Sequence, residues 1–179
     1  YEHDVDSVVH LAFILKPRHR RRPVDQVNVR GTRNILEACS RSGVQRLLYL
    51  SSTSVYGAHP DNPPLLTEKS PVRPINGFQY SEAKIISESL LQEFGQHLPQ
   101  CSVAILLACP IIGPNADNFI SRAFSKRFLV GVKDHDPPLQ FLHEEDLIDV
   151  ILLCLAQSVG GLYNVAGRGD VRWTEVATS

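Results

Sequence analysis

Short apolar runs alternate with segments of helical periodicity along this chain. The apolar runs lie at 6–12, 46–50, 103–108 and 162–166, and they lack the strict apolar–polar alternation of a strand with one face in water. Such strands are typical of a parallel sheet that is covered on both faces, and the helical segments between them supply the cover. The pattern therefore predicts an α/β fold with a parallel sheet between layers of helices.

Three segments have the spacing of amphipathic helices. The inner stripe of the first comprises Asn28, Thr32, Ile35, Leu36 and Cys39, with an end at Gly43. The second begins near Tyr80, and its stripe comprises Ala83, Ile86, Leu90 and Phe94, with Gly95 as the predicted stop. The third follows three acidic residues at 144–146, and its stripe comprises Leu147, Val150, Ile151, Cys154 and Leu155. A proline-rich loop at 58–78 and a short helix at 117–125 complete the expected elements.

Length and composition fit one ordinary domain of 179 residues, 43% hydrophobic and 21% charged. No apolar run reaches bilayer-spanning length and no signal-peptide pattern opens the sequence, so we expect a cytoplasmic protein without a membrane partner. The sequence opens on Tyr1 and contains no methionine, and we expect it to be part of a longer protein. The cysteines lack the close pair spacings of a zinc site and are interpreted as reduced core residues, so no metal is expected.

The net charge of −1 gives no reason to expect a nucleic-acid partner. One basic run, Lys-Pro-Arg-His-Arg-Arg-Arg at 16–22, stands out. A solvated loop is the interpretation that we favour, because charge blocks are usually exposed. Contact with a phosphate group of a cofactor or substrate is the alternative.

Tyr80 and Lys84 lie one helical turn apart, downstream of a hydroxyl-rich strand end at 51–57. An ammonium group at i+4 on the same helix face favours the phenolate and makes the phenol proton mobile. In a parallel sheet, ligands bind beyond the carboxyl ends of the strands, where segments 10–12, 51–52 and 109–110 also fall. These residues therefore predict a proton-transfer site suited to making and breaking carbonyl groups.

The chain resembles the extended short-chain dehydrogenase/reductase family, also called the NAD-dependent epimerase/dehydratase family. The matching motifs occur in family order and are Val9-His10-Leu11-Ala12, Asn28-Val29-Arg30-Gly31-Thr32-Arg33-Asn34, Ser51-Ser52-Thr53-Ser54-Val55-Tyr56-Gly57, Tyr80-Ser81-Glu82-Ala83-Lys84, Pro110-Ile111-Ile112-Gly113-Pro114 and Phe141-Leu142-His143-Glu144-Glu145-Asp146. The resemblance implies a Rossmann-like, doubly wound parallel sheet. Residues 1–179 would form part of an NAD(P)-binding domain that lacks its first βαβ half, and the substrate-binding portion would start in about 110–179.

The resemblance also implies residue roles. Tyr80 would be the general acid/base. Ser52, which lies five residues before Gly57, would bind the reacting oxygen. Lys84 would hold the nicotinamide ribose and lower the pKa of Tyr80. Charge builds on oxygen as hydride leaves or reaches carbon, and a phenol and a hydroxyl can neutralise it. The residues that would line the NAD or NADP crevice are His10, Leu11, Ala12, Asn28, Tyr80, Lys84 and Pro110.

Each of these residues also has a structural explanation. Tyr80 could pack beneath the proline-rich loop, and Ser52 could cap a turn. Asn28 could satisfy a neighbouring backbone group as readily as it could contact a cofactor. His10 is expected to be a structural residue at a strand end, and Asp146 is expected to serve the start of its helix.

Departures from the family pattern bear on the substrate. Thr53 and Ser54 stand where sugar-nucleotide dehydratases of the family carry acids, so elimination of water is not expected. Pro110 and Leu139 replace an asparagine and an arginine that often lie near the substrate of epimerases, which argues against a nucleotide diphosphate in its usual place. No glycine-rich turn for a dinucleotide pyrophosphate precedes His10, so the first half of the fold lies outside this sequence or the cofactor site is degenerate.

Two functions stay open from the sequence. The preferred one is an NAD(P)-dependent oxidoreductase or epimerase that transfers hydride at an alcohol or ketone carbon of a small, sugar-like or other substrate. The alternative is a non-catalytic sensor or scaffold that binds a dinucleotide or a protein partner. The helices that carry Asn28 and Tyr80 could also pair two subunits of a homodimer.

Overall fold

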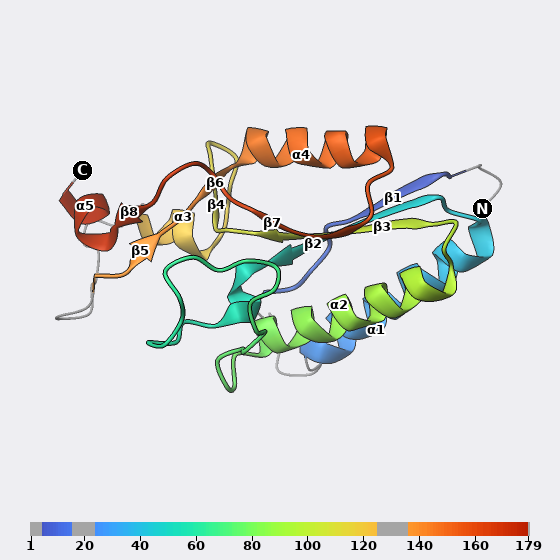
Figure 1. Ribbon diagram of the computed structural model, residues 1–179, viewed down its shortest axis with the longest axis horizontal. Coiled ribbons are helices and arrows are strands. Elements are labelled where there is room, and N and C mark those ends of the chain that lie inside the picture. The colour runs from blue at the N-terminus through green and yellow to red at the C-terminus, as the bar shows by residue number, and fades with distance from the viewer. Residues whose placement is uncertain (1–4, 16–23, 125–135, 179) are drawn as a thin grey trace.

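A four-stranded parallel sheet of order β1-β2-β3-β7 forms the centre of the molecule (Figure 1). The computed structural model describes residues 5–15, 24–124 and 136–178. The strands are β1 (Ser7–His10), β2 (Arg46–Ser52), β3 (Ser102–Ala108) and β7 (Gly161–Val165). Every pairing in this sheet is parallel. The α/β architecture expected from the apolar runs is confirmed. The basic run at 16–22, for which a solvated loop was the favoured interpretation, lies outside the described residues.

Helices cover both faces of this sheet. The helices α1 (Val24–Ser42) and α2 (Gln79–His97) lie on one face, and α4 (Glu144–Gln157) lies on the other (Figure 1). The sequence of β2 is apolar without alternation because residues on both of its faces are buried. Leu47 and Tyr49 belong to the core cluster beneath α1 and α2, whereas Leu48 belongs to the cluster beneath α4. Both faces of the strand are therefore buried, as expected for a covered parallel sheet.

Helix α1 agrees with its predicted stripe. Asn28, Thr32, Leu36 and Cys39 are buried at helical spacing. The helix ends one residue before Gly43, whose φ of +66° lies in the left-handed region that favours glycine.

The buried face of α2 differs from the predicted apolar stripe. Its buried residues are Ser81, Ala83, Lys84, Ser87, Glu88 and Leu91. Ile86, which the stripe predicted to be inside, is 44% exposed. Gly95 does not end the helix, which continues to His97; a Cβ at Gly95 would lie 3.3 Å from Val103, so the missing side chain allows close approach to β3. Of the predicted stripe, Ala83 is buried, and Leu90 and Phe94 pack against the core, so the prediction was wrong only for Ile86. It missed the buried polar residues because a hydrophobic pattern does not register hydrogen-bonded polar groups.

Small elements follow β3 beyond the carboxyl edge of the sheet. They are β4 (Ile111–Ile112), α3 (Phe119–Phe124), β5 (Pro138–Leu139), β6 (Leu142–His143), β8 (Val171–Arg172) and α5 (Trp173–Thr178). Strands β4 and β6 pair in parallel, and β5 and β8 pair antiparallel. The N-cap of α4 is His143, whose Nδ1 accepts from the backbone of Glu145 at 3.3 Å, rather than Asp146, which lies inside the first turn.

The proline-rich segment at 58–78 is a loop, as expected, and it is fastened to the sheet. A 3₁₀ turn, η1 (Thr53–Tyr56), leads into it from β2. The Tyr56 hydroxyl donates to Asn164 Oδ1 on β7 at 2.8 Å, and the Asn164 backbone N–H donates to Glu68 at 2.8 Å. These bonds hold the loop against the carboxyl edge, where the candidate site lies.

The cysteines are free, and Cys39, Cys101 and Cys109 are buried, which agrees with their interpretation as reduced core residues. No described helix combines the length and apolar character needed to cross a membrane. Within the described ranges, no three side chains of the His, Cys, Asp and Glu type are grouped to hold a metal ion.

Candidate active site at the carboxyl edge of the sheet

Strand β2 and helix α2 bring the three predicted catalytic residues together. Ser52 is the last residue of β2, opposite Ala108 in the register of β2 and β3. Helix α2 begins at Gln79 beside this edge (Figure 1). Tyr80 therefore lies in its first turn and Lys84 one turn later. The spacing of the two side chains along the helix therefore places both over the end of β2.

Tyr80 is hydrogen-bonded to Ser52 and enclosed by aromatic rings. Its ring meets that of Phe13 edge-on with centroids 5.5 Å apart, and that of Phe78 at 5.8 Å. Burial raises the pKa of the Tyr80 phenol, and the hydrogen bond with Ser52 opposes the rise. Overall the pKa of Tyr80 is therefore raised rather than lowered, because the loss of water around the phenol is the largest effect on it.

The Lys84 amine is buried among aromatic faces. Its Nζ donates to the backbone oxygen of Leu50 at 2.6 Å and lies 3.8 Å from the ring centroid of Phe13, 4.6 Å from that of Tyr49 and 5.7 Å from that of Tyr80. Burial lowers the pKa of Lys84 to about 7, and the negative charge of Glu88 opposes this effect. Lys84 is thus not a solvated surface residue, since it is 3% exposed.

Sequence reasoning missed two polar residues beside Lys84. Glu88 lies four residues further along α2 and is 5% exposed. Its carboxylate accepts a hydrogen bond from the hydroxyl of Ser51, the neighbour of Ser52 on β2. The i, i+4 spacing of an acid and a base on one helix was the available signal.

Ser52 also makes the structural contact that was its alternative explanation. Its Oγ accepts from the backbone N–H of Ser54 at 3.2 Å and so caps η1. Thr53 donates to the backbone oxygen of Ala108 at 3.4 Å, and Ser54 receives the hydroxyl of Ser81 at 3.0 Å. The two positions where family dehydratases carry acids therefore hold hydroxyls engaged in local hydrogen bonds.

The end of β1 supplies one buried and two exposed residues. His10 is buried, and its Nε2 lies 3.1 Å from the hydroxyl of Thr32 on α1. Burial, with a smaller effect of the Lys84 charge, lowers the pKa of His10. This environment matches a structural histidine, whereas Leu11, 51% exposed, and the exposed Ala12 present surface beside the site.

Asn28 and Pro110 lie on two further sides of this edge. The Asn28 side chain accepts from the backbone N–H of Ile14 at 2.9 Å and donates to its oxygen at 3.0 Å, which is the structural alternative weighed from the sequence. Pro110 is exposed two residues after the end of β3, and its backbone oxygen accepts from the backbone N–H of Leu142 on β6 at 3.1 Å.

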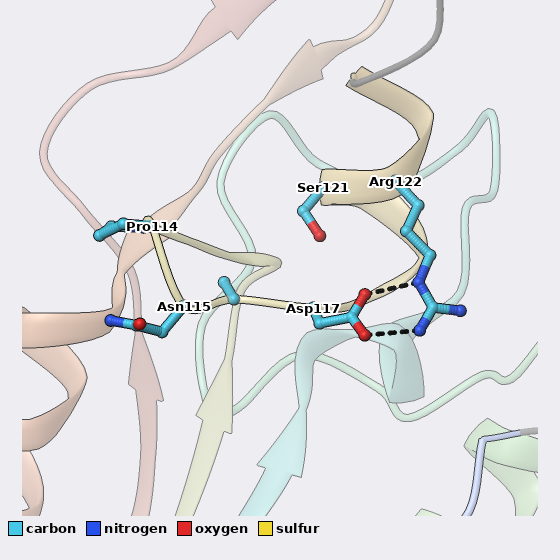
Figure 2. Close-up of a pocket in the computed structure, with 7 residues that line it drawn as sticks. Pro114, Asn115, Asp117, Ser121 and Arg122 are labelled. Carbon is cyan, nitrogen blue, oxygen red and sulfur yellow. Dashed lines mark hydrogen bonds and ion pairs between the residues drawn. The ribbon is translucent and has the colours of Figure 1, made fainter.

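A separate hollow of about 260 Å³ lies in segment 113–122, between β4 and α3 (Figure 2). Arg122 and Asp117 point toward each other across it and form two hydrogen bonds of 2.5 and 2.7 Å. Asn115 donates to Glu144 of α4 at 2.9 Å. The arginine of this hollow is therefore already paired with a carboxylate.

Comparison with known proteins decides the family. Residues 1–166 match the NAD dependent epimerase/dehydratase family. The chain belongs to this family. Among its relatives, the N-acetyl-alpha-D-glucosaminyl-diphospho-ditrans,octacis-undecaprenol 4-epimerase of Escherichia coli O157:H7 is 32% identical over 158 residues, which cover 84% of this chain and 46% of that protein. The chain spans about half the length of the curated relatives that it matches.

Solved structures of similar proteins confirm the Rossmann-like fold of this family member. MoeE5 in complex with UDP-glucuronic acid and NAD superposes with a TM-score of 0.81 at 25% identity, covering 98% of this chain and 61% of MoeE5. RMD from Pseudomonas aeruginosa, complexed with NADPH, gives a TM-score of 0.78 at 28% identity, covering 95% of this chain and 63% of RMD.

Proposed function

We propose that the protein to which this chain belongs is an NAD(P)-dependent oxidoreductase or epimerase that transfers hydride at an alcohol or ketone carbon. The observation that carries the proposal is the Tyr80 phenol hydrogen-bonded to Ser52 with the buried Lys84 amine 5.7 Å from its ring. Membership of the epimerase/dehydratase family supports it, as do a 4-epimerase relative and similar structures solved with NAD or NADPH.

The side chains at this edge fit the nicotinamide half of such a cofactor. Lys84 carries three N–H donors, and within the described residues one of them is used, by the Leu50 oxygen. Lys84 and Tyr80 would hold the ribose hydroxyls, and the exposed Leu11, Ala12 and Pro110 would border the ring. His10 and Asn28 would support this wall through their bonds to Thr32 and Ile14.

The residues divide the proton chemistry among them. When bound, the nicotinamide accepts or supplies the hydride. Tyr80 exchanges a proton with the substrate oxygen, while the Ser52 hydroxyl hydrogen-bonds to that oxygen as charge develops on it. The ammonium form of Lys84 favours the Tyr80 phenolate through the low-dielectric interior that separates them.

The departures at Thr53 and Ser54 limit the reaction. Neither hydroxyl has an acid or base strength suited to removing water near neutral pH, and both are engaged in local hydrogen bonds. The proposal therefore covers oxidation, reduction and epimerisation of a small, sugar-like or other alcohol or ketone, and leaves out dehydration.

We further propose a homodimer that pairs through α1 and α2. Ile86 on α2 is exposed and available for such a contact. Sedimentation that shows a monomer alone would contradict this proposal.

The test is cofactor-dependent turnover in the natural full-length protein, followed by NAD(P)H absorbance over a panel of alcohols, ketones and sugar nucleotides. Tyr80→Phe is expected to lower kcat by about 10²- to 10⁴-fold, because general acid–base catalysis contributes that much. Tyr163→Phe is the matched control, since the Tyr163 hydroxyl donates to the backbone oxygen of Gly160, just before β7, and its side chain is exposed. Undiminished turnover in Tyr80→Phe would remove Tyr80 from the mechanism. Tight NAD(P) binding without any turnover would instead favour the non-catalytic sensor or scaffold.

A further inference from the structure

Glu88 is a buried carboxyl group for which the proposed mechanism has no use. It lies on the inner face of α2, one helical turn beyond Lys84, and is 5% exposed. The hydroxyl of Ser51 donates to its Oε1. A carboxyl group is rarely buried unless it is paired, so this one needs a physical reason.

Charge gives that reason. Burial raises the pKa of Glu88, and both the Ser51 hydrogen bond and the Lys84 charge oppose the rise. Burial lowers the pKa of Lys84, and the Glu88 charge is what opposes it. Each group therefore favours the ionised form of the other in a place that water does not reach.

We propose that Glu88, held by Ser51, is the positioning residue that increases the protonated fraction of Lys84 beneath Tyr80. The inference rests on the proposed function, because the charge of Lys84 matters to the reaction only if Tyr80 transfers a proton. The two adjacent serines of β2 then have different hydrogen-bond partners. Ser52 bonds to the phenol of Tyr80, and Ser51 donates to the carboxylate of Glu88.

Other titratable groups face this pair from each packed element. The Lys84 charge contributes to lowering the pKa of His10 on β1. The Glu88 charge contributes to raising the pKa values of Tyr49 on β2 and Tyr56 in η1. Burial raises the pKa of both tyrosines above the model-compound value of 10.0 and lowers that of His10 below 6.5. Lys84, with a pKa of about 7, therefore titrates between them and can be followed separately.

The test follows the Cε resonance of Lys84 by NMR during a pH titration of the full-length protein with isotopically labelled lysine, assigned with Lys84→Arg. In Glu88→Gln the pKa of Lys84 is expected to fall by about one pH unit or more, since a nearby opposite charge has been removed. Glu93→Gln is the matched control, because Glu93 is an exposed acid on the same helix. An unchanged Lys84 titration in a folded Glu88→Gln protein overturns the proposal.

A second variant keeps the test decisive if Glu88→Gln does not fold. Ser51→Ala leaves the carboxyl in place but removes the donor that favours its charged form, so the pKa of Lys84 should fall as well, by less than in Glu88→Gln. No change in Ser51→Ala, with Glu88→Gln unfolded, would also overturn the proposal.

Turnover gives an independent readout. The loss of kcat in Glu88→Gln should shrink as the pH is lowered and Lys84 becomes protonated in both proteins, and Glu88→Asp should restore part of it. A purely structural effect would give a loss that does not vary with pH. If Tyr80→Phe abolishes turnover while Lys84 titrates normally in Glu88→Gln, this inference alone fails; if Tyr80→Phe has no effect, the proposed function fails whatever the titration shows.

Discussion

The side-chain amide of Asn28 on α1 forms hydrogen bonds with both backbone polar groups of Ile14. It accepts from the Ile14 N–H at 2.9 Å and donates to the Ile14 oxygen at 3.0 Å. The adjacent Phe13 ring lies 3.8 Å from the Lys84 amine and meets the Tyr80 ring edge-on. Helix α1 therefore holds the segment that carries one aromatic wall of the site through a single amide.

Replacing this amide tests that relationship. In Asn28→Asp the carboxylate cannot donate to the Ile14 oxygen, so we expect the free energy of unfolding to fall by about 1–3 kcal/mol in urea denaturation, the cost of leaving a buried polar group unpaired. Asn34→Asp makes the same change at an exposed position of α1 and should stay within about 0.5 kcal/mol of the wild type. Equal stability of the two variants would contradict the assigned function of Asn28.

Substitution of Gly57, at the end of η1, tests how closely the proline-rich loop packs against η1. Its φ is +68°, and a Cβ there would lie 2.2 Å from the backbone oxygen of Arg73. Gly43→Ala is the matched variant, because φ is +66° with nothing within 4 Å of an added Cβ, and it should cost about 1–2 kcal/mol. We expect Gly57→Ala to lower the melting temperature further than Gly43→Ala. Equal shifts would show that the Arg73 carbonyl moves aside freely.

Three substitutions distinguish the Ser52 hydroxyl from the side-chain contacts that support η1. Ser52→Ala should lower kcat by about 10²- to 10³-fold, the usual cost of removing one donor to a developing oxyanion. Ser52→Thr keeps a hydroxyl and should recover much of the activity. Ser54→Ala removes the partner of Ser81 without touching the phenol and should leave turnover near the wild-type value. A comparable loss in the Ser54 variant would indicate that the geometry of η1, rather than the Ser52 hydroxyl, governs the rate.

Lys84 should make stability depend on pH. Burial lowers its pKa from 10.5 to about 7, so between these values the unfolded chain binds more protons and the free energy of unfolding rises with pH. From pH 7 to pH 8 the gain should be on the order of 1 kcal/mol. Above this range the trend is opposed by the four cysteine thiols, because burial raises their pKa values. Urea denaturation of Lys84→Met should lack this gain. A wild type whose stability is constant over the same range would show that Lys84 is hydrated.

The sequence predicted the sheet because burial on both faces leaves a direct signature. Leu47 and Leu48 are adjacent and both apolar, and they belong to core clusters on opposite faces of β2. Parallel strands then bring Ser52 and Pro110 to one edge without any knowledge of the loops. The position of the candidate site follows from the same reasoning.

The inner face of α2 could not be predicted in this way. Lys84, Ser87 and Glu88 are buried through hydrogen bonds and charge, whereas the apolar Ile86 is exposed. A hydrophobic pattern assigns the inside to apolar residues, so it included Ile86 and left out the buried polar residues. The partners that satisfy the polar groups, such as Ser51 on β2, are distant in sequence and become neighbours only after folding.

The pairs β4 with β6 and β5 with β8 were missed for a different reason. Each strand has two residues, which is too short for any periodicity, and their pairing is set by the loops that connect them. Asn28 illustrates a third limit. Its two alternatives need the same residue type, and the contacts with Ile14 distinguish them only in three dimensions.

The all-parallel order of the central sheet has a kinetic consequence. Ser7 on β1 pairs with Arg46 on β2, 39 residues away, and no strand of this sheet can form a hairpin with its neighbour in the chain. Each pairing must wait for a long loop to close, and the entropy of closure is lost before the contacts are gained. Refolding of this domain should therefore be slow compared with helical proteins of the same size, and the exposed strand edges of the partly assembled chain should make it prone to aggregate at high concentration.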